Sequence, residues 1–482
     1  MKNFIPSLLA AATALLATAC TTPENAYVRL SDAACTFLPA GNQPKAIEVN
    51  ASGPWSAEPG ASWLTVERSA EGLSLSVADN EDGERNTVIT VTCNGATARI
   101  AVLQMAPDNT LYRYRNLKSF DMQATMSKNG RYIGGNIKDL LSDGSWVNYP
   151  TIIDLETDEW IQHGPFPNTL FNIELPFAIS DEGTVFFLDA NTTACVGFNL
   201  AGDYFLPANA EGHKLLPSVQ SISADGRTWV GWGLDDVLAL GGMYRPLKWT
   251  DGGTPEVLPV PELNYRNQPY VSGVMARGCS ADGSVIYGST WDNLDNGMLY
   301  WKDGKVDWVG RDVRDVRTVQ IENSMGELID EVIVNGMTVT AELTNISPNG
   351  KWIGGTYRTE DYPSPRNYVQ ARYPAFFNTE TGKTTVVKDF GEGFGGHVTD
   401  DGLGIILPGT FLPTSGIVYD IENQVSLGSV AEWILDNYGM VIPMCYITYM
   451  TPDKSCLLGT VVEYSEVGPR TVSWYMAPPV KR

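Results

Sequence analysis

The chain has 482 residues, of which 43% are hydrophobic and 18% are charged, and its formal net charge at pH 7 is −23. A surface this acidic repels phosphate, and no basic cluster compensates for it, so the composition excludes nucleic acid as an expected partner. The length is sufficient for two or more domains.

The N-terminus predicts an exported protein. It has a basic start, an apolar run from Phe4 to Leu16 and a small-residue cleavage site that ends in Cys20. The apolar run is too short to span a bilayer, and no other stretch approaches the required length of about 20 apolar residues.

This leader resembles a bacterial lipoprotein signal, which implies cleavage before Cys20 and acylation of its thiol. An ordinary cleaved signal with an incidental cysteine is the alternative. We therefore expect a signal peptide at residues 1–19 and a polar tether at residues 20–26. A lipid anchor would then hold the protein at the outer membrane, on its periplasmic or its extracellular face.

Six further cysteines could pair in an oxidising compartment, although their spacing is irregular and no CxxC pair suggests a metal site. Cys35 and Cys93 lie in the same small predicted domain and form the first candidate disulfide. Cys445 and Cys456, on predicted strands that flank one turn, form the second. Buried free thiols are an equally good interpretation.

The first predicted domain spans residues 27–105 and is all-β. Apolar and polar residues alternate in four segments, which are residues 45–50, 73–77, 87–92 and 98–102. Strands that recur about every 10 residues over about 80 residues predict a small β-sandwich.

Several landmarks in this segment resemble the BACON domain. They are Trp55-Ser56-Ala57, Ala61 to Val66, Asp79-Asn80-Glu81, Arg85-Asn86-Thr87 and Ile100 to Gln104. The resemblance implies an immunoglobulin-like module common in Bacteroidetes surface proteins, often placed ahead of carbohydrate-active domains. The family name suggests glycan or mucin binding, whereas some members resemble spacers. We expect Trp55 and Trp63 to pack in the core rather than to hold sugar, and we expect the domain to be a spacer.

Seven copies of a short turn motif organise the rest of the chain, at intervals of 43 to 67 residues. They begin at Ser127, Ser180, Ser223, Ser280, Ser347, Thr399 and Thr451. The hydroxyl and an Asp or Asn bond to nearby backbone, and the Gly that ends the motif takes a positive φ. The last copy is degraded, with Lys454 in place of the Gly. Each copy predicts a strand, a turn and a second strand, and an aromatic or apolar third strand follows. Repeats of this length with four strands each predict a β-propeller.

The ring is predicted to close between the two ends of this domain, which spans residues 108–478. The last repeat lacks a fourth strand, and Thr110 to Arg115 supply the natural candidate. Closure would give seven blades and would remove the exposed sheet edges. In five copies a glycine stands eight residues beyond the Ser or Thr, where a strand must end or another backbone must approach closely.

The repeats resemble the TolB-type Ser-Pro-Asp-Gly propellers and the HAF extracellular repeats. This resemblance implies only a fold, because propellers host binding, scaffolding, hydrolysis and lyase chemistry alike. The connection between Val309 and Ile346 is longer than the others. Its segment 330–340 predicts an extra hairpin with a turn at Asn335-Gly336.

Recognition is expected on the long loops between the second and third strands, on the face opposite the repeated turns. These loops are residues 139–148, 232–245, 289–297 and 357–373. Aromatic rings there could stack on sugars, with Arg or Asp beside them to bond hydroxyls. The predicted binding residues are Trp232, Tyr244, Arg245, Trp291, Asp292, Tyr357, Arg358 and Tyr362. The alternative is that these aromatic residues pack loop on loop.

Signals for catalysis are weak. The three histidines are not spaced as a metal pair, and no Gly-x-Ser-x-Gly elbow is present. We therefore assign no catalytic residue, metal or cofactor. A carboxylate pair for glycoside hydrolysis is recognised by its separation in space, which the sequence does not give. The favoured function is non-catalytic binding of a glycan or glycoprotein. The alternatives are a polysaccharide hydrolase or lyase and a protein–protein scaffold.

Overall fold

The computed structural model describes residues 26–82, 85–105, 112–120, 123–212, 217–235, 243–290, 297–339, 345–409, 416–442, 445–465 and 468–480. These residues are nearly all β-structure, as predicted, with one α-helix among them, α2 (Val430–Tyr438). Ser429 and Glu432 form a capping box at its start, and Gly439 ends it in the left-handed conformation, with φ 62°. None of the described helical segments has the length and apolar character needed to cross a membrane.

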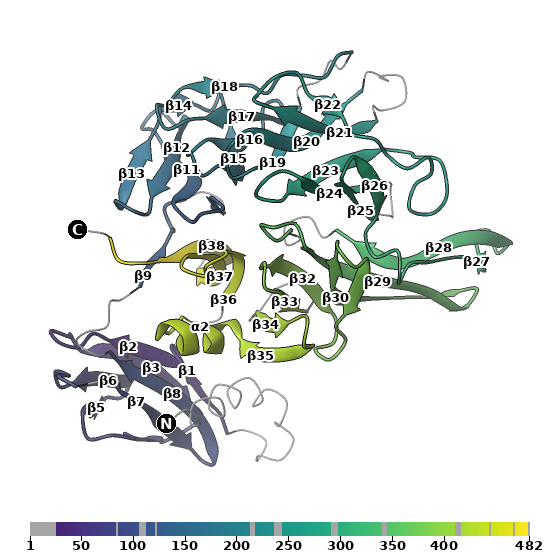
Figure 1. The fold of residues 1–482 in the computed structure, drawn as a ribbon. Helices are drawn as coiled ribbons and strands as arrows, with labels where there is room; N and C mark the ends of the chain where they lie inside the picture. Colours follow the sequence, from purple (N-terminus) through teal and green to yellow (C-terminus); the bar gives the residue numbers. More distant parts are fainter. Residues whose placement is uncertain are drawn as a thin grey trace. The chain divides into compact units, whose positions relative to one another are not determined.

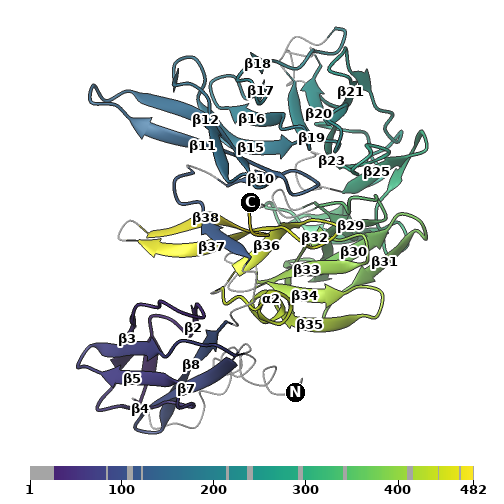
Figure 2. The same cartoon turned by 60° about the vertical axis from the view of Figure 1, so that its left-hand side comes forward.

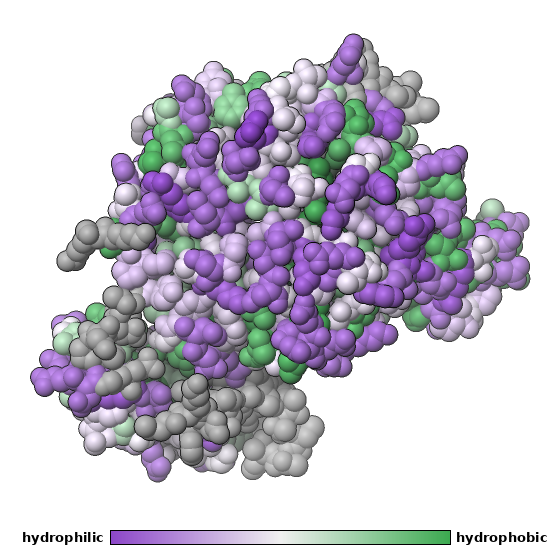
Figure 3. Space-filling model, in the orientation of Figure 1, coloured by the Kyte–Doolittle hydropathy of each residue, from purple (hydrophilic) through white to green (hydrophobic). Residues whose placement is uncertain are grey.

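The chain forms two compact units. The first contains the residues up to Tyr112 together with Leu427–Cys445, and the second contains Arg113–Ser426 and Tyr446–Arg482. The grouping of 427–445 with the N-terminal residues was not expected from the sequence. On the face drawn in Figure 3, hydrophilic residues predominate and apolar ones occur in small separate groups.

The N-terminal residues of the first unit build two four-stranded sheets. One sheet has the order β1 (Val28–Leu30), β3 (Lys45–Ala51), β6 (Gly72–Val77) and β5 (Leu64–Arg68). The other has the order β2 (Ala34–Phe37), β8 (Ala96–Gln104), β7 (Arg85–Cys93) and β4 (Ser56–Glu58). The inward side chains of both sheets share one core, in which Ile47, Leu75, Ile89 and Ile100 are buried. The alternating pattern of the sequence therefore places one face of each sheet in this core.

All six described cysteines are buried free thiols in this structure, which matches the alternative that the sequence left open beside the two candidate disulfides. Cys35 pairs in register with Val102 of β8, whereas Cys93 pairs with Ala96. Six residues along a strand span about 20 Å, and a disulfide needs Cα atoms within about 7 Å. Cys445 and Cys456 are likewise free.

Seven antiparallel sheets follow one another among the described residues 113–477, and their residues belong to the second unit except Leu427–Ser429 of β35 and Cys445 of β36. The first contains β10 (Thr125–Met126), β11 (Tyr132–Leu140), β12 (Trp146–Asp154), β13 (Glu159–Gln162) and β14 (Phe166–Pro167). The second contains β15 (Ile173–Ile179), β16 (Val185–Asp189), β17 (Ala194–Phe198) and β18 (Tyr204–Phe205). The third contains β19 (Ser218–Ile222), β20 (Thr228–Leu234), β21 (Tyr244–Thr250) and β22 (Glu256–Val257).

The remaining four sheets continue in chain order, and the colours of Figure 2 change from teal to yellow along them. The fourth contains β23 (Val274–Cys279), β24 (Val285–Thr290), β25 (Met298–Lys302) and β26 (Lys305–Trp308). The fifth contains β27 (Asp315–Glu322), β28 (Leu328–Thr338), β29 (Trp352–Ser364), β30 (Asn367–Asn378) and β31 (Lys383–Val386). The sixth contains β32 (Gly393–Val398), β33 (Leu403–Pro408), β34 (Ile417–Asp420) and β35 (Val425–Ser429). The seventh contains β36 (Cys445–Met450), β37 (Leu457–Ser465), β38 (Gly468–Ala477) and β9 (Arg113–Asn116).

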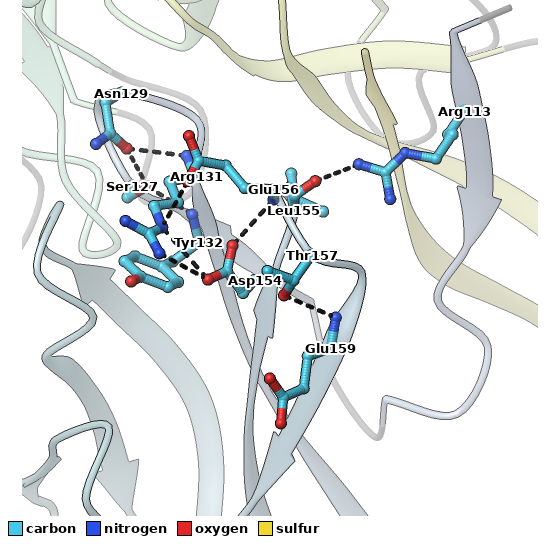
Figure 4. Close-up of polar contacts among 10 residues, drawn as sticks. All are labelled: Arg113, Ser127, Asn129, Arg131, Tyr132, Asp154, Leu155, Glu156, Thr157 and Glu159. Atoms are coloured by element: carbon cyan, nitrogen blue, oxygen red, sulfur yellow. Dashed lines mark hydrogen bonds and ion pairs between the residues drawn. The ribbon is translucent and has the colours of Figure 1, made fainter. Parts of the chain in front are cut away.

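The last sheet is completed by a strand from the opposite end of the unit, as the sequence predicted. β9 pairs antiparallel with β38, and Figure 1 shows the two side by side. Arg113 and Arg115 of β9 each form an ion pair of 3.0 Å with Asp158, which follows β12 of the first sheet. Arg113 also donates to the carbonyl oxygen of Leu155 (Figure 4). β9 therefore ties the last sheet to the first.

The extra hairpin exists, but its predicted turn is wrong. Asn335 and Gly336 lie inside β28, and the chain turns instead at Asn323–Glu327. The side chain of Asn323 accepts hydrogen bonds from the backbone N–H groups of Met325 and Glu327, each at 2.9 Å. Gly336 is needed for another reason, since a Cβ there would lie 1.9 Å from the hydroxyl oxygen of Tyr265.

The repeated turns have the chemistry that the sequence predicted. In the first copy, Ser127 donates to the side chain of Asn129 and accepts from the backbone N–H of Tyr132, each at 2.9 Å. Asn129 accepts from the backbone N–H of Arg131, and Gly130 has φ 77° (Figure 4). In six copies the turn joins the first and second strands of its sheet, whereas in the fifth sheet, which begins with the extra strand β27, it lies between β28 and β29. The connections between second and third strands of the other six sheets therefore lie at the opposite end, as expected.

Candidate functional site

The repeated turns bond to one another from sheet to sheet. Those of the second, third, fourth and fifth sheets are linked by backbone hydrogen bonds from Asp181 to Ala224 (2.9 Å), from Ala224 to Ala281 (2.7 Å) and from Ala281 to Pro348 (2.6 Å). These contacts gather the turn-proximal ends of the first strands, so that side chains from different repeats can share one site.

Two links in this series use a carboxylate instead. The backbone N–H of Asn129 donates to Asp181 at 2.9 Å, and that of Asn349 donates to Asp400 at 2.8 Å. Pro348 has no N–H, so the residue after it is the donor. Burial raises the pKa of the Asp181 and Asp400 carboxyl groups, and the bonds from Asn129 and Asn349 oppose this effect.

A cavity of about 290 Å³ lies within the second unit, lined in large part by the first strands of five of the seven sheets. Strands β10, β15, β19, β23 and β36 all contribute lining residues, as do Val339 and Asn345 of the fifth repeat. The lining includes the polar residues Gln123, Thr125, Lys128, Gln220, Ser221, Arg277, Tyr287, Asn345, Thr448 and Tyr449. The described lining residues are apolar, neutral polar or cationic.

Three lining residues sit on β-bulges. The register of β15 shifts between Pro176 and Ala178, and that of β19 shifts between Val219 and Ser221, so that Phe177 and Gln220 are the extra residues. Arg277 is the extra residue of β23, between Ala276 and Gly278. Each lies three residues before the serine of its turn. A bulge re-aims its side chain, and these three residues line the same cavity.

Two cations face this cavity in different settings. Lys128 donates to the carbonyl oxygen of Cys279 at 3.1 Å, and its charge lowers the pKa of Asp181 against the effect of burial. The Nε of Arg277 donates to Ser289 at 3.4 Å. Burial lowers the pKa of Arg277, and the ionisable groups that oppose this effect are Tyr287 and Tyr244. Arg277 and Lys128 therefore place two positive charges at the lining of this cavity.

His397 of β32 lies beside the cavity rather than in its lining. It is 1% exposed, its Nδ1 is 3.3 Å from the side-chain nitrogen of Asn345, and its Nε2 is 3.2 Å from the carbonyl oxygen of Met450. Burial lowers the pKa of His397 to about 3. Its position favours the structural role expected for a single histidine. No group of three or more His, Cys, Asp or Glu residues suited to a metal ion occurs in the described ranges.

Three predicted binding residues lie together on the third sheet. Trp232 of β20 and Tyr244 of β21 form an edge-to-face pair at 5.1 Å. Arg245 forms an ion pair with Asp235 at 2.7 Å. They are strand residues at the edges of their loop, and they are absent from the cavity lining.

Tyr357, Arg358 and Tyr362 lie on a hairpin and not on the predicted loop. β29 and β30 run through residues 357–373 apart from a short turn. Arg358 forms an ion pair of 3.0 Å with the buried Glu360, and the Tyr362 ring lies 5.1 Å from that of Tyr368. These contacts match the alternative of packing among the aromatic segments. Trp291, Asp292 and Cys20 lie outside the described residues.

The landmark residues of the N-terminal segment make structural contacts. Trp55 and Trp63 are partly buried against the core, with the guanidinium groups of Arg68 and Arg85 over their rings at 4.7 and 4.8 Å. Arg85 donates to Gln104 at 2.7 Å. These observations agree with the expected core role of the two tryptophans.

Comparison with known proteins identifies part of the chain. Residues 53–105 match the BACON family model, described as "Putative binding domain, N-terminal". The chain thus contains a BACON domain there, as the resemblance in its sequence implied. No curated protein matches the chain.

Solved structures that resemble the chain include TolB from Acinetobacter baumannii, at 11% identity, with 88% of this chain and 80% of that chain covered and a TM-score of 0.33. A DUF4784 family protein from Bacteroides caccae is 9% identical, with 84% and 95% covered and a TM-score of 0.23. With TM-scores below 0.5, neither likeness supports an argument about function.

Proposed function

We propose that this chain is a non-catalytic binding protein for a glycan or glycoprotein, and that the cavity of the second unit is its contact site. The observation that carries the proposal is the bulged trio of Phe177, Gln220 and Arg277 on three successive sheets. It brings an aromatic ring, an amide and a guanidinium to one cavity. Sugars offer apolar faces and hydroxyl groups, which these side chains suit.

We further propose that the seven sheets of the second unit close into a seven-bladed propeller. The pairing of β9 with β38, the ion pairs to Asp158 and the bonds between turns support closure. In this proposal the BACON domain is an immunoglobulin-like sandwich that serves as a spacer. The two sheets that share one core support the sandwich.

A glycan screen tests the proposed function. The full mature chain is screened against host and dietary glycans, with binding and product release measured in parallel. We expect binding without product, and we expect Gln220→Ala to weaken it about tenfold, because hydrogen bonds to sugar hydroxyls would be lost. Trp232→Ala is the matched control, because Trp232 lies outside the cavity lining.

The other outcomes point to the alternatives. If Trp232→Ala loses binding and Gln220→Ala keeps it, the ligand contacts the loop-edge aromatic residues that were predicted from the sequence. Product release would favour a hydrolase or lyase, whose carboxylates would then have to be located. If neither binding nor product is detected, the protein–protein scaffold becomes the better hypothesis.

Lipid attachment is tested separately through Cys20. We expect the wild type to partition into detergent and to incorporate radioactive palmitate in cells, because the leader resembles a lipoprotein signal. The Cys20→Ala variant should lose both properties. A wild type recovered as a soluble and unlabelled protein would contradict this proposal.

A further inference from the structure

We propose that the cavity is specific for a small ligand that carries a carboxylate, and that Arg277 binds this group. Resting on the proposed function, the inference narrows its ligand to an acidic sugar such as a uronic acid. It goes beyond that function because it assigns both the charge of the ligand and the residue that recognises it.

The position of Arg277 carries the first step. It is the extra residue of the β23 bulge, and its side chain lines the cavity. The bond from its Nε to Ser289 orients the guanidinium group. A guanidinium presents its N–H groups as a planar fork, which matches the two oxygens of a carboxylate better than it matches a neutral hydroxyl.

The charges around the cavity carry the second step. Lys128 and Arg277 are the charged residues among its described lining, although the whole chain has a net charge of −23. Lys128 donates a hydrogen bond to the carbonyl oxygen of Cys279, and its charge lowers the pKa of Asp181. Burial lowers the pKa of Arg277, and electrostatic interactions with Tyr287 and Tyr244 oppose this effect. An anion beside Arg277 would stabilise its charge further.

The neighbouring bulges carry the third step. Gln220 and Phe177 occupy the equivalent positions of the two preceding repeats and line the same cavity. An amide can both donate to and accept from sugar hydroxyls, and an aromatic ring offers a flat apolar face. A volume of about 290 Å³ suits one small molecule and is too small for a folded partner.

The test compares acidic and neutral sugars on the full mature chain by isothermal titration calorimetry. The probes are D-glucuronate and D-galacturonate, with D-glucose and D-galactose as neutral counterparts and benzoate as a carboxylate without sugar. We expect each uronate to bind at least about tenfold more tightly than its neutral counterpart. We expect Arg277→Gln to remove this preference and Arg277→Lys to restore part of it.

Arg227→Gln is the matched control. It removes the same charge from an exposed turn residue whose partner is Asp251, outside the cavity lining. Circular dichroism and thermal unfolding show whether each variant is folded. If Arg277→Gln does not fold, a preference that is weaker than in the wild type but still present in a folded Arg277→Lys carries the test instead.

Each outcome decides a different point. Equal affinity for acidic and neutral sugars, or the same effect from Arg227→Gln as from Arg277→Gln, overturns the inference and leaves the glycan-binding proposal standing. Binding of benzoate through Arg277 with no sugar bound supports a carboxylate site but overturns the acidic sugar as its ligand, and the wider glycan screen still decides the proposed function. Absence of binding by every probe overturns the inference, whereas the wider glycan screen still decides the proposed function.

Discussion

Replacing Gly231 with alanine is expected to lower the free energy of unfolding by about 3 kcal/mol or more. Gly231 is one of the five glycines that stand eight residues beyond the Ser or Thr of their repeats. A Cβ on Gly231 would lie 1.9 Å from the carbonyl oxygen of Ser218, which belongs to the neighbouring strand β19. The backbones of β19 and β20 would have to move apart, and the pairing of these two strands would be disturbed. Urea unfolding of the second unit measures the change.

Gly253→Ala is the matched control for this variant. Gly253 has no positive φ, and a Cβ there would meet the carbonyl oxygen of Thr250 at 3.3 Å, a contact that a small shift relieves. We expect the control to change stability by less than about 1 kcal/mol. A Gly231→Ala variant as stable as the control would show that β19 and β20 separate freely, against the packing described above.

Acidification from pH 7 to pH 5 is expected to cost the folded protein about 2 kcal/mol through His397 alone. The imidazole is fully buried, and its pKa falls from 6.5 to about 3 in the folded state. Below pH 6.5 the unfolded chain binds a proton that the folded chain does not, so stability falls as the pH falls towards 3. The charge of Lys128 acts in the same direction as burial.

Urea unfolding at pH 7 and pH 5 checks this value for the wild type and for His397→Asn. The variant will be less stable at both pH values, but the difference between them should shrink by about 2 kcal/mol. His163→Asn is the control, because the imidazole of His163 is only partly buried. Burial lowers the pKa of His163, and a hydrogen bond with the backbone of Asn199 opposes this effect. An unchanged pH dependence in His397→Asn would mean that the imidazole is solvated in the folded state.

Much of the strand arrangement could be predicted because its determinants are local. A hydroxyl, an Asp or Asn and a Gly within four residues are enough to form each turn, and alternating apolar residues mark the strands beside it. Counting strands in the last repeat predicted the pairing of β9 with β38. The prediction of a turn at Asn335-Gly336 was wrong because Gly336 instead makes room for the side chain of Tyr265. This long-range contact is not visible in any local sequence pattern.

The candidate site was mostly missed, because a bulge depends on the register between two strands. Trp232 and Tyr357 attracted attention as aromatic residues in long connections, yet both lie in strands. One signal was present in the sequence. The residue three positions before the turn serine varies from Phe177 to Gln220 to Arg277, although its neighbours are apolar or small. When the residue type varies at one position of a repeat, packing does not determine the side chain at that position.

The bonds between turns have a consequence for how such a chain can be rearranged. Wherever a turn has Asn in its third position, the next turn has Asp in its second, as in Asn129 with Asp181 and Asn349 with Asp400. The first and second repeats therefore form one matched pair, and the fifth and sixth form another. Exchanging the second repeat with the third would place Ala224 after the first turn, where it offers no carboxylate to the backbone N–H of Asn129. The order of these repeats is thus a property that selection can act on.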